Sequence, residues 1–572
     1  MHTMDQEIRS FIDDAYERAM KDSDLITEQD LVRMLSLDPE SEECGYLGKK
    51  AREIARVKVN NRAMVSTAFG IDYQSCAASC KYCSFGKEWG LVQGEYYVPA
   101  EDIVRLIRSQ MGRGFRRFTL RTTEYYDIDR LCDMARTIRG QVPGKFWLSA
   151  NTGELSPEQC RKMHEAGFNA AYHTLHLREG TDTNFKPEVR LRTMKAIRDS
   201  GLVLNTGIDP IGVEHTAEEI AERIITIRKL KPRSMCSMKR INPKGTPVGD
   251  VPEVSDRRVA QIAAVIRFAT DGGVSAVPMT RIAMEWGATG TSIGTGANPR
   301  DSSQDIHTFG VWRSDQDALR YMFRDAGYEI DIPEKAECPI CRGPLRPMQK
   351  EFGKCSFCGT ETDLVSSCDD GHRICASCTE PIIRSEIKRV CMSSQSKDPY
   401  DILMDILDVP IVFGRMVKFH IAIPAALVTA YCNVKGDRGR LSAMLDEAMW
   451  RGDHVPPKAC GHWGTCGAAV SCGVFYSVVT GTSPLSEESF GRLHVLTGRC
   501  LIEIGENGGP RCCNRSTLSS LRHTVQFVKD ELGVEMEWHD RVCDKQSWNK
   551  QCMGVKCPFN PKHHTDRRAG TR

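Results

Sequence analysis

The sequence predicts an α/β protein: a parallel (β/α) barrel at residues 61–333, then a small metal-binding module, then a mainly α-helical, cysteine-rich domain. Three observations predict this order. Short β-like runs alternate with amphipathic helices in the first part, paired Cys-x-x-Cys knuckles follow it, and 18 of the 25 cysteines lie at or beyond residue 338. A chain of 572 residues is also too long for one ordinary domain.

Residues 1–60 are predicted to form an N-terminal helical segment, because apolar side chains recur there at helical spacing. From about residue 61 the pattern changes to β-then-α units, with β-like runs at 118–121, 146–149 and 203–206. Repeated units of this kind form a parallel sheet, and six or more of them form a barrel or partial barrel. Such barrels carry their chemistry at the carboxyl ends of the strands.

Cys76, Cys80 and Cys83 form the most informative motif, a Cys-x3-Cys-x2-Cys run. Three thiolates at this spacing can surround one iron–sulfur cluster. A cubane [4Fe–4S] cluster normally takes four, so one iron stays open for a ligand that is not protein. Half of a zinc site is one alternative, but no second knuckle lies within about fifty residues. Disulfide bonding is another, but nothing marks the chain as secreted.

The motif, with Tyr82 before its last cysteine and Phe85 and Gly86 after it, resembles the radical S-adenosylmethionine superfamily. That resemblance implies a TIM-type (β/α) barrel and a cluster whose open iron binds the amino and carboxylate groups of S-adenosylmethionine. One electron, from a donor such as ferredoxin or flavodoxin, would then cleave the sulfonium to a 5′-deoxyadenosyl radical. Over residues 45–330 the resemblance is closest to the biotin synthase, HydE and PylB-like branch.

Four further residues are assigned to the cofactor by that resemblance. Glu124 follows a predicted strand, where the family's carboxylate receives the amino group of S-adenosylmethionine. Arg190 resembles the arginine that pairs with the methionine carboxylate, a task that suits a guanidinium. Arg178 and Glu179 lie where the family has polar residues facing the cofactor. The alternatives are an ordinary loop acid for Glu124 and a surface ion-pairing arginine for Arg190.

The resemblance stops short of biotin synthase chemistry. Biotin synthase takes sulfur from a second cluster deep in the barrel, held by three cysteines and an arginine. At the matching strand positions this chain has residues such as Thr122, Asn151 and Asn205. Sulfur insertion by that route is therefore not expected. Cys236 is a lone cysteine near the sixth strand, and a packed core thiol is the simpler interpretation of it.

Residues 334–390 are predicted to form a zinc-ribbon-like module. Its first site consists of two Cys-x-x-Cys knuckles separated by thirteen residues, a strong zinc-ribbon spacing: Cys338, Cys341, Cys355 and Cys358. Its second zinc site is offered by Cys368, His372, Cys375 and Cys378. The spacing leaves open a cross-braced arrangement of these eight residues, a second iron–sulfur site, or spare thiols. A zinc module of this kind more often stabilises a fold than catalyses a reaction.

Residues 391–572 are predicted to form a mainly helical, cysteine-rich domain. The first candidates for an auxiliary cluster or a redox thiol pair are Cys460, Cys466, Cys512 and Cys513, since glycines beside them let the backbone approach a ligand closely. Buried structural cysteines are an equally weighted alternative. The region resembles a cysteine-rich domain of uncharacterised function associated with radical enzymes of methanogenic archaea, and that resemblance implies no activity.

Charge and hydropathy give no support for a nucleic-acid-binding protein or a membrane protein. With 77 basic and 75 acidic residues the net charge is +2, which gives no argument for a nucleic-acid partner. No segment is long and apolar enough to span a bilayer, and the most apolar one, 419–431, is predicted to be a buried helix. The start of the chain is polar, and the many cysteines favour metal over disulfides, so a reducing, anaerobic cytoplasm is the expected setting.

Three functional hypotheses follow. The leading one is a radical S-adenosylmethionine enzyme whose radical abstracts hydrogen from a small intermediate in cofactor or amino-acid biosynthesis, with the protein supplying position and electrostatics. The second is the same chemistry on a protein or RNA docked by the zinc module. The third is a non-catalytic iron–sulfur and zinc electron carrier. The three-cysteine motif argues against the third, because a carrier would normally supply a fourth thiolate.

Overall fold

The computed structural model describes residues 5–295, 316–412, 419–546 and 549–563. The chain divides into two compact units. The first is built mainly from the residues up to Ile332, and the second mainly from those beyond Arg342. The short segment 333–341 is divided between them.

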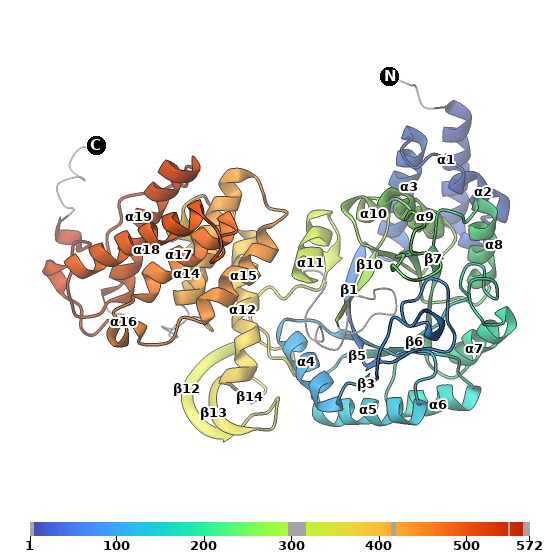
Figure 1. Ribbon diagram of the computed structural model, residues 1–572, viewed down its shortest axis with the longest axis horizontal. Coiled ribbons are helices and arrows are strands. Elements are labelled where there is room, and N and C mark those ends of the chain that lie inside the picture. The colour runs from blue at the N-terminus through green and yellow to red at the C-terminus, as the bar shows by residue number, and fades with distance from the viewer. Residues whose placement is uncertain (1–4, 296–315, 413–418, 547–548, 564–572) are drawn as a thin grey trace. The chain divides into compact units, whose positions relative to one another are not determined.

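Among the described residues, eight parallel strands of the first unit close into a barrel (Figure 1). The strands are β1 (Arg62–Gly70), β4 (Arg117–Arg121), β5 (Trp147–Asn151), β6 (Ala170–Tyr172), β7 (Val203–Ile211), β8 (Ser234–Lys239), β9 (Gly273–Val277) and β10 (Gly290–Thr295). They follow one another in sequence order, and β10 pairs with β1 to close the barrel, with Met64 opposite Gly290. A short strand, β11 (Glu329–Ile330), pairs with the start of β1. The predicted parallel barrel is confirmed.

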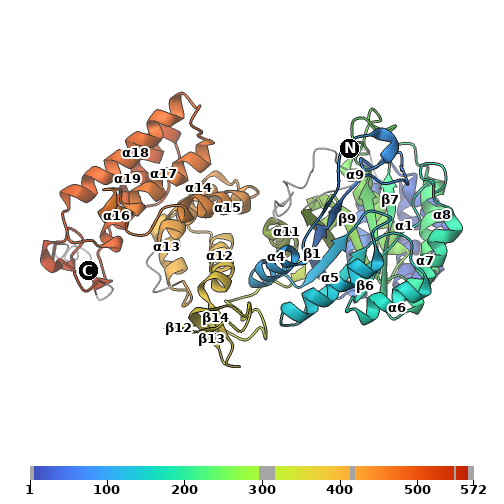
Figure 2. The ribbon, with the colours of Figure 1, turned by 60° about the horizontal axis from the view of Figure 1, so that its bottom comes forward.

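Helices connect these strands and lie outside the barrel. They are α4 (Ala100–Gly112), α5 (Ile128–Gln141), α6 (Pro157–Glu165), α7 (Pro187–Asp199), α8 (Ala217–Arg228), α9 (Asp256–Phe268), α10 (Arg281–Glu285) and, after β10, α11 (Gln316–Asp325). Figure 2 shows α5 to α8 along the outside of the sheet. Capping boxes fix two of the starts, Ser156 with Gln159 at α6 and Thr216 with Glu219 at α8. Each box satisfies N–H groups that the first helical turn leaves without partners.

The N-terminal helices pack on the outer side of two barrel helices. They are α1 (Gln6–Lys21), η1 (Ser23–Leu25), α2 (Glu28–Leu35) and α3 (Glu42–Lys58), with α2 against α8 and α3 against α9. Helix α9 therefore has neighbours on both sides, and every residue from Val259 to Phe268 is buried. The buried Gln261 side chain donates to the carbonyls of Met34 at 3.0 Å and Leu37 at 2.9 Å, which ties the two layers together.

The second unit begins with a three-stranded antiparallel sheet followed by helices. The sheet contains β12 (Leu345–Lys354), β13 (Glu361–Cys368) and β14 (Arg373–Cys375). The helices are α12 (Ala376–Ser393), α13 (Pro399–Leu407), α14 (Phe419–Lys435), α15 (Leu441–Asp453), α16 (Ala459–His462), α17 (Gly467–Thr480), α18 (Glu488–Glu506), α19 (Cys513–Leu532) and the short η6 (Gly554–Lys556). The predicted mainly helical character of this region is confirmed.

Helix α14 is the centre of the helical part. It packs against α13, α15 and α17, and nearly all of its residues from Phe419 to Thr429 are buried. The sequence prediction of a buried helix at 419–431 is thus confirmed. Within the described ranges, no helix is long and apolar enough to cross a membrane.

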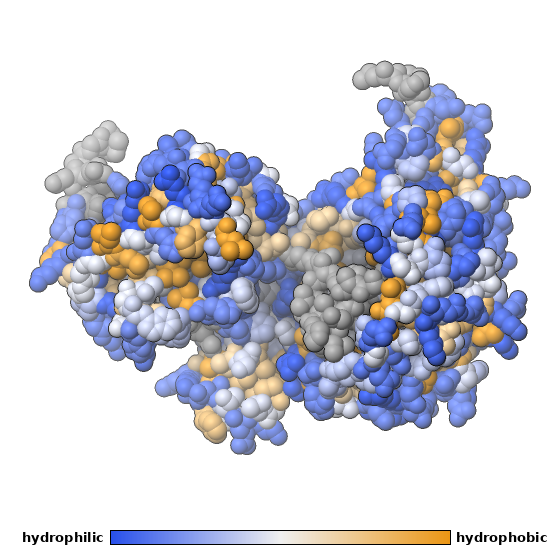
Figure 3. Space-filling model, in the orientation of Figure 1, coloured by the Kyte–Doolittle hydropathy of each residue, from blue (hydrophilic) through white to orange (hydrophobic). Residues whose placement is uncertain are grey.

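Apolar side chains remain on the surface of the second unit. Figure 3 shows them as orange patches over its helices. Helix α18 buries few residues, and exposed apolar side chains on it and just before it include Leu485, Phe490, Val495 and Ile502. Each of these side chains is at least 40% exposed, whereas Leu496 and Cys500 of the same helix are fully buried.

Candidate active site at the carboxyl end of the barrel

The loop that carries Cys76, Cys80 and Cys83 follows the carboxyl end of β1. It starts after the two-residue strand β2 (Asp72–Tyr73), which pairs with β3 (Tyr96–Tyr97). The loop closes on itself, because the main-chain N–H of Cys76 donates to the Phe85 carbonyl at 2.6 Å. The motif therefore lies at the edge where parallel barrels carry their chemistry.

Side chains from elsewhere in the barrel hold this loop in place. Lys81 Nζ lies 3.0 Å from Asp182 Oδ1, and Asn184 Nδ2 donates to the Ala78 carbonyl at 3.0 Å. Gly86 lets the loop turn tightly after its last cysteine, because a Cβ there would lie 2.2 Å from Nε1 of the Trp89 indole. Gly86, which contributes to the family resemblance, is therefore also required at this position for steric reasons.

The three thiols are close enough to affect one another's ionisation. Burial raises the pKa of Cys80 well above its usual value, and the sulfurs of Cys83 and Cys76 raise it further. Burial also raises the pKa of Cys76, although the main-chain N–H groups of Ala78 and Glu124 donate to its sulfur and act in the opposite direction. Three thiolates in this loop therefore need a bound cation to offset their charge.

Arg190, on α7, is the charged centre of the site. Its side chain is only 4% exposed, and its guanidinium lies 3.3 Å from a carboxylate oxygen of Glu124, 3.1 Å from Glu154 and 3.7 Å from Glu179. The guanidinium also stacks on the Phe185 ring, 3.9 Å from its centre. Burial alone would lower the pKa of Arg190, but the three carboxylates raise it above its ordinary value. Arg190 is therefore a buried arginine and not a surface ion-pairing one.

Glu124 and Glu154 are brought together by the ends of β4 and β5. The main-chain N–H of Glu154 donates to Glu124 Oε1 at 3.2 Å. Gly153 permits this approach, because a Cβ there would lie 1.9 Å from the Glu124 carbonyl oxygen. The sequence prediction named Glu124 and missed Glu154. The signal that could have found it was available, since both acids follow the end of a predicted strand.

Glu179 and Arg178 are neighbours in sequence but point to different surroundings. The Glu179 side chain is fully buried. Burial would raise its pKa, but the charge and hydrogen bond of His176 and the charge of Arg190 lower it to about 2. Arg178 instead forms an ion pair with Glu219 of α8 at 2.7 Å and does not line the barrel cavity. The left-handed backbone at Arg178, with φ of 52°, turns the chain between the two side chains. This geometry removes Arg178 from the proposed site.

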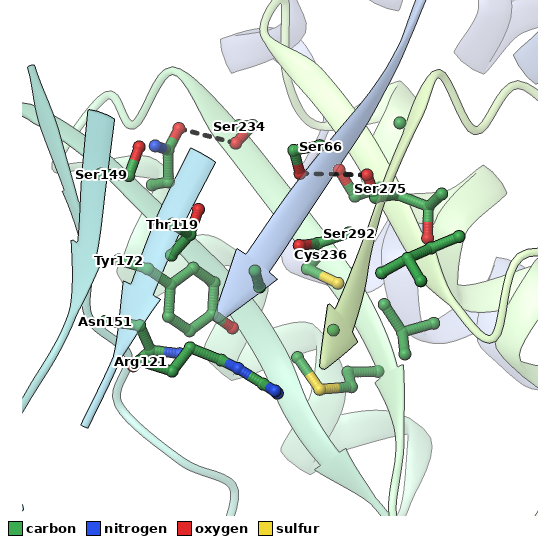
Figure 4. Close-up of a pocket in the computed structure, with 18 of the residues that line it drawn as sticks. Ser66, Thr119, Arg121, Ser149, Asn151, Tyr172, Ser234, Cys236, Ser275 and Ser292 are labelled. Carbon is green, nitrogen blue, oxygen red and sulfur yellow. Dashed lines mark hydrogen bonds between the residues drawn. The ribbon is translucent and has the colours of Figure 1, made fainter. Parts of the chain in front are cut away.

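The cysteine loop and Arg190 face a cavity of about 1740 Å³ inside the barrel. In many such barrels, branched apolar side chains fill the interior. Here short polar side chains point inward instead, and Figure 4 shows Ser66, Thr119, Ser149, Ser234, Ser275 and Ser292 among them. Ser234 donates to the side-chain oxygen of Asn205 at 2.8 Å. Because these side chains are too short to meet across the barrel, the interior stays open and polar.

Larger polar side chains lie where neighbouring strands end. Arg121, Asn151 and Tyr172 are the last residues of β4, β5 and β6, and Figure 4 shows them close together at the cavity wall. The Tyr172 hydroxyl donates to Asp209 Oδ2 at 2.9 Å. Gly294 gives Arg121 its room, because a Cβ at that position would lie 2.5 Å from an Arg121 Nη atom. These groups add hydrogen-bonding capacity near the cysteine loop.

In the 334–390 module, the eight predicted zinc ligands form two compact groups. In each group all four ligand atoms lie within 4.8 Å of one another; one contains Cys338, Cys341, Cys368 and His372, the other Cys355, Cys358, Cys375 and Cys378. The Cys358 and Cys375 sulfurs are 3.8 Å apart, and the Cys368 sulfur is 3.3 Å from His372 Nδ1. Zinc–sulfur bonds of ~2.3 Å place tetrahedral sulfurs ~3.8 Å apart, so each group could hold one metal ion.

This grouping corrects the predicted order of ligands, in which Cys338 and Cys341 shared a site with Cys355 and Cys358. The two knuckles lie at opposite ends of the ten-residue strand β12, which at ~3.4 Å per residue separates them by roughly 30 Å. Strand β13 then returns antiparallel and brings Cys368 opposite Leu345, next to the first knuckle. The cross-braced arrangement, which the sequence left open, is the one that forms.

A third compact group in the described residues, Asp182, Glu214 and His215, has protein counter-ions of its own. Lys81 contacts Asp182, and Arg240 donates to Glu214 Oε2 at 3.0 Å. Because these side chains neutralise the carboxylates, the group needs no metal ion to balance its charge.

The four cysteines predicted as an auxiliary site in the second unit lie near one another without forming a compact group among the described residues. Burial, with the nearby sulfurs of Cys466, Cys512 and Cys460, raises the pKa of Cys513 to about 11. Cys512 also caps the start of α19. Its side chain lines a separate small cavity together with Cys543, Cys552 and Cys557.

Comparison with known proteins finds one family model, and it matches the second part of the chain. The model of a family described as "Family of unknown function (DUF5714)" matches residues 387–560, which cover the helical part of the second unit. That description supplies no activity for the region.

The chain is also similar to biotin synthases. It is 27% identical over 206 residues to the enzyme of Desulforudis audaxviator, a match that covers 34% of this chain and 61% of the relative. It is 25% identical over 345 residues to the enzyme of Streptomyces avermitilis, covering 57% of this chain and 81% of the relative. A third, from Magnetococcus marinus, is 27% identical over 202 residues, with 34% and 62% covered. The chain thus spans about three fifths of the length of two of these relatives.

Solved structures with some likeness include methylornithine synthase (PylB), with a TM-score of 0.47 and 16% identity over 55% of this chain and 97% of that one. HydG, a maturase of the [FeFe]-hydrogenase, has a TM-score of 0.47 and 15% identity over 89% of this chain and 99% of that one. Likeness of this extent carries no argument about activity. The biotin synthase matches and the closed parallel barrel do confirm the predicted resemblance to the biotin synthase branch of radical S-adenosylmethionine enzymes.

Proposed function

We propose that this protein is a radical S-adenosylmethionine enzyme that acts on a small polar molecule held inside the barrel. One observation carries the proposal: the three thiols of the Cys76 loop and the Glu124–Arg190 pair line the same cavity of about 1740 Å³. An incomplete set of cluster ligands, one acidic and one basic side chain, and space for a substrate therefore lie together. Nothing comparable is found in the two compact metal-binding groups of the second unit.

The residues of the loop fit a [4Fe–4S] cluster. Cys76, Cys80 and Cys83 offer three thiolates, and among the described residues they are not one of the compact groups that suit a single ion. Wider spacing is expected when thiolates surround several iron atoms. N–H groups of Ala78 and Glu124 donate to the Cys76 sulfur, and hydrogen bonds of this kind tune such clusters. When bound, the cluster and S-adenosylmethionine would supply a carbon radical that abstracts hydrogen.

Arg190 and Glu124 would hold the two charged ends of the amino-acid part of S-adenosylmethionine. A guanidinium grips a carboxylate through two N–H groups, and the Glu124 carboxylate accepts from an ammonium. The two side chains contact each other at 3.3 Å, and an incoming zwitterion can replace that contact with the same pair of charges. Glu154 and Glu179 also contact Arg190, so they would keep it oriented while Glu124 changes partner.

The charge of the site also suits this ligand. Three carboxylates face one guanidinium in a buried place, with His176 against Glu179 and His173 against Glu154, so negative charge is in excess unless both histidines are protonated. A ligand that brings positive charge is favoured there, and S-adenosylmethionine carries a sulfonium as well as an ammonium.

The lining of the cavity favours a polar substrate and disfavours one biotin synthase step. Serine and threonine hydroxyls line the barrel wall, and Arg121, Asn151 and Tyr172 add larger hydrogen-bonding groups (Figure 4). Among the described lining residues, Cys236 is the only cysteine outside the Cys76 loop. A second barrel cluster held by three cysteines would find only one of them, Cys236, in this lining, so the proposed reaction does not take sulfur from such a cluster.

The proposal is tested by anaerobic reconstitution with iron and sulfide, followed by S-adenosylmethionine and dithionite. The wild-type protein is expected to release 5′-deoxyadenosine, and Cys83→Ala is expected to release none above background. Cys160→Ala is the matched control, because Cys160 is a buried cysteine on α6 that does not line the cavity. A wild-type protein that holds its full iron and still releases no 5′-deoxyadenosine would contradict the proposal.

We also propose that the 334–390 module binds two zinc ions that stabilise its fold. Each group presents four ligand atoms, which is the complete set of a structural zinc site. The sheet of the module has a small apolar core, since Leu345 is the only buried residue of β12 and few other apolar side chains, such as Phe357, Leu364 and Ile374, are buried beside it. A hairpin with so small a core depends on its metal for folding energy. Metal analysis should find two zinc ions per chain, and one after loss of either group.

A further inference from the structure

The segment that follows α19 has little regular structure and a small apolar core. Beyond Gly533, the described residues form no α-helix and only short 3-10 turns such as η6. Few apolar side chains of the segment are buried, among them Val534, Met536 and Phe559. A long irregular segment is uncommon in a compact domain unless it is functional or something other than a core holds it.

Four cysteines meet at one small cavity within this segment. The cavity, of about 20 Å³, is lined by Cys512 at the start of α19 and by Cys543, Cys552 and Cys557. None of the 25 cysteines of the chain forms a disulfide, so the four thiols are available as ligands.

Three of the four sulfurs accept hydrogen bonds from nitrogen donors. The bonds are Arg515 N–H to Cys512 at 3.5 Å, Asn514 Nδ2 to Cys543 at 3.2 Å, and Gly554 N–H to Cys552 at 3.4 Å. Donors aimed at sulfur stabilise the thiolate over the thiol, and they are the usual outer partners of cysteine ligands in metal sites. Cys512 gains further from its place at the start of the 20-residue helix α19, where the helix dipole favours negative charge.

Positive side chains accompany the four thiols. Arg515 and Lys545 both line the cavity, and Arg515 is only 5% exposed. The Arg515 guanidinium donates to the Gly508 and Pro510 carbonyls, the second at 2.9 Å, and contacts the Met553 sulfur, so its hydrogen bonds are made within the second unit. Four thiolates around a metal centre would add negative charge beside it, whereas four neutral thiols would not.

The spacing of the sulfurs separates this site from the zinc-type groups of the same chain. In those groups all four ligand atoms lie within 4.8 Å of one another, as one tetrahedral ion requires. Within the described residues, neither the Cys512 set nor the Cys76 loop forms so compact a group. Thiolates held further apart around a cavity suit a centre of several iron atoms bridged by sulfide.

We propose that Cys512, Cys543, Cys552 and Cys557 bind an iron–sulfur cluster with four cysteine ligands, distinct from the cluster of the barrel. Because all four ligands come from the protein, this cluster has no open iron, and it holds the irregular segment against the start of α19. The assignment shares Cys512 with the ligand set expected from the sequence and replaces the other three members. It places a metal centre in a region that matches a family of unknown function.

Iron and acid-labile sulfide analysis of the full chain tests the proposal. The variant Cys76→Ala/Cys80→Ala/Cys83→Ala removes the barrel ligands, so any remaining iron reports the second site. After anaerobic reconstitution, about two to four iron atoms per chain and equal sulfide are expected to remain, the range for cubane and rhombic clusters with four cysteines. Their visible absorption should bleach with dithionite. In the same background, Cys552→Ser is expected to lower the remaining iron at least fourfold, and Cys460→Ser to leave it unchanged.

Three outcomes would overturn the proposal: less than about half an iron atom per chain in the triple variant, a third zinc ion in place of iron, or loss of iron with Cys460→Ser and not with Cys552→Ser. Cys552 is exposed, so its substitution removes a ligand with little loss of packing. Cys543→Ser provides a second ligand variant, and circular dichroism of each protein shows whether the helices remain. The result does not depend on the proposed barrel chemistry, because the triple variant lacks that site.

Discussion

The cysteine loop of the barrel and the cysteine module at 334–390 both offer cysteine thiols as metal ligands, but they differ in how many ligands each site provides. The loop offers three thiols and faces a cavity of about 1740 Å³. The module offers two groups of four ligand atoms, each compact. A site with a missing ligand can bind a molecule, whereas a complete site can only hold its ion. Ligand number, read together with the space beside it, thus separates a candidate catalytic centre from a structural one.

The two regions also differ in what supports them. The Cys76 loop is closed by its own hydrogen bonds and anchored to the barrel through Lys81 and Asn184. In the module, strand β12 buries only Leu345. The loop is therefore expected to keep its shape without metal, while the module depends on metal to fold.

The largest expected effect tests that difference. Cys375→Ser removes one ligand of the Cys355 group, and we expect loss of one zinc ion per chain and at least a tenfold faster proteolytic cleavage of the module. The reason is that structural zinc contributes about 10–16 kcal/mol of apparent folding energy in small zinc domains. Metal analysis and limited proteolysis measure both. Cys80→Ala is the matched comparison and should change unfolding by ~1 kcal/mol or less. Equal destabilisation by the two variants would contradict the comparison.

The next effect concerns the buried charge beneath the barrel site. Against an unfolded value of ~4.3, the pKa of Glu179 is lowered to about 2 in the folded protein. The ionised carboxylate therefore stabilises the first unit above about pH 4.5, by about 3 kcal/mol, and this contribution is lost as the pH falls towards 2.

Urea unfolding of wild-type protein and Glu179→Gln at pH 7 and at pH 3 measures this contribution. The difference between the two proteins should be large at pH 7 and should at least halve at pH 3. A difference that does not change with pH would show that folding does not lower the pKa of Glu179.

A smaller effect is expected from Glu124→Gln, which keeps the shape of the side chain and removes its charge. If Glu124 receives the amino group of S-adenosylmethionine, the KM for that molecule should rise about 10- to 100-fold, since a hydrogen bond to a charged group contributes about 1.5–3 kcal/mol. Release of 5′-deoxyadenosine as a function of S-adenosylmethionine concentration measures it. Glu158→Gln, at an exposed acid at the start of α6, is the control and should leave the KM unchanged.

The smallest effect separates two arginines that the sequence treated alike. Arg178→Ala should change activity less than twofold and stability by ~1 kcal/mol or less, because Arg178 forms a partly exposed ion pair with Glu219 and does not line the cavity. Arg190→Lys keeps the charge but loses the bidentate grip, so it should raise the KM for S-adenosylmethionine at least tenfold. A large loss of activity in Arg178→Ala would show that Arg178 takes part in cofactor binding after all.

Much of the fold and part of the site could be predicted. The barrel followed from repeated β-then-α units, while the assignment of Cys76, Cys80 and Cys83 as cluster ligands, made from their spacing, stays a prediction. These signals are local, since period and spacing along the chain describe one strand, one helix or one loop at a time. Glu154 was missed although it follows a strand end as Glu124 does, because only contact with Arg190 distinguishes it from an ordinary loop acid.

By itself, the sequence determined which residue types are available as ligands and which elements form, because both depend on neighbours within a few residues. Only the tertiary structure decided which ligands belong together. The length of β12 separates the two knuckles, and the return of β13 brings Cys368 beside Cys338. A left-handed residue takes Arg178 out of the cavity, and the segment after α19 returns three cysteines to Cys512. Strand register and the return of the chain bring together residues that are far apart in sequence, and a local sequence pattern describes only residues that are close in sequence.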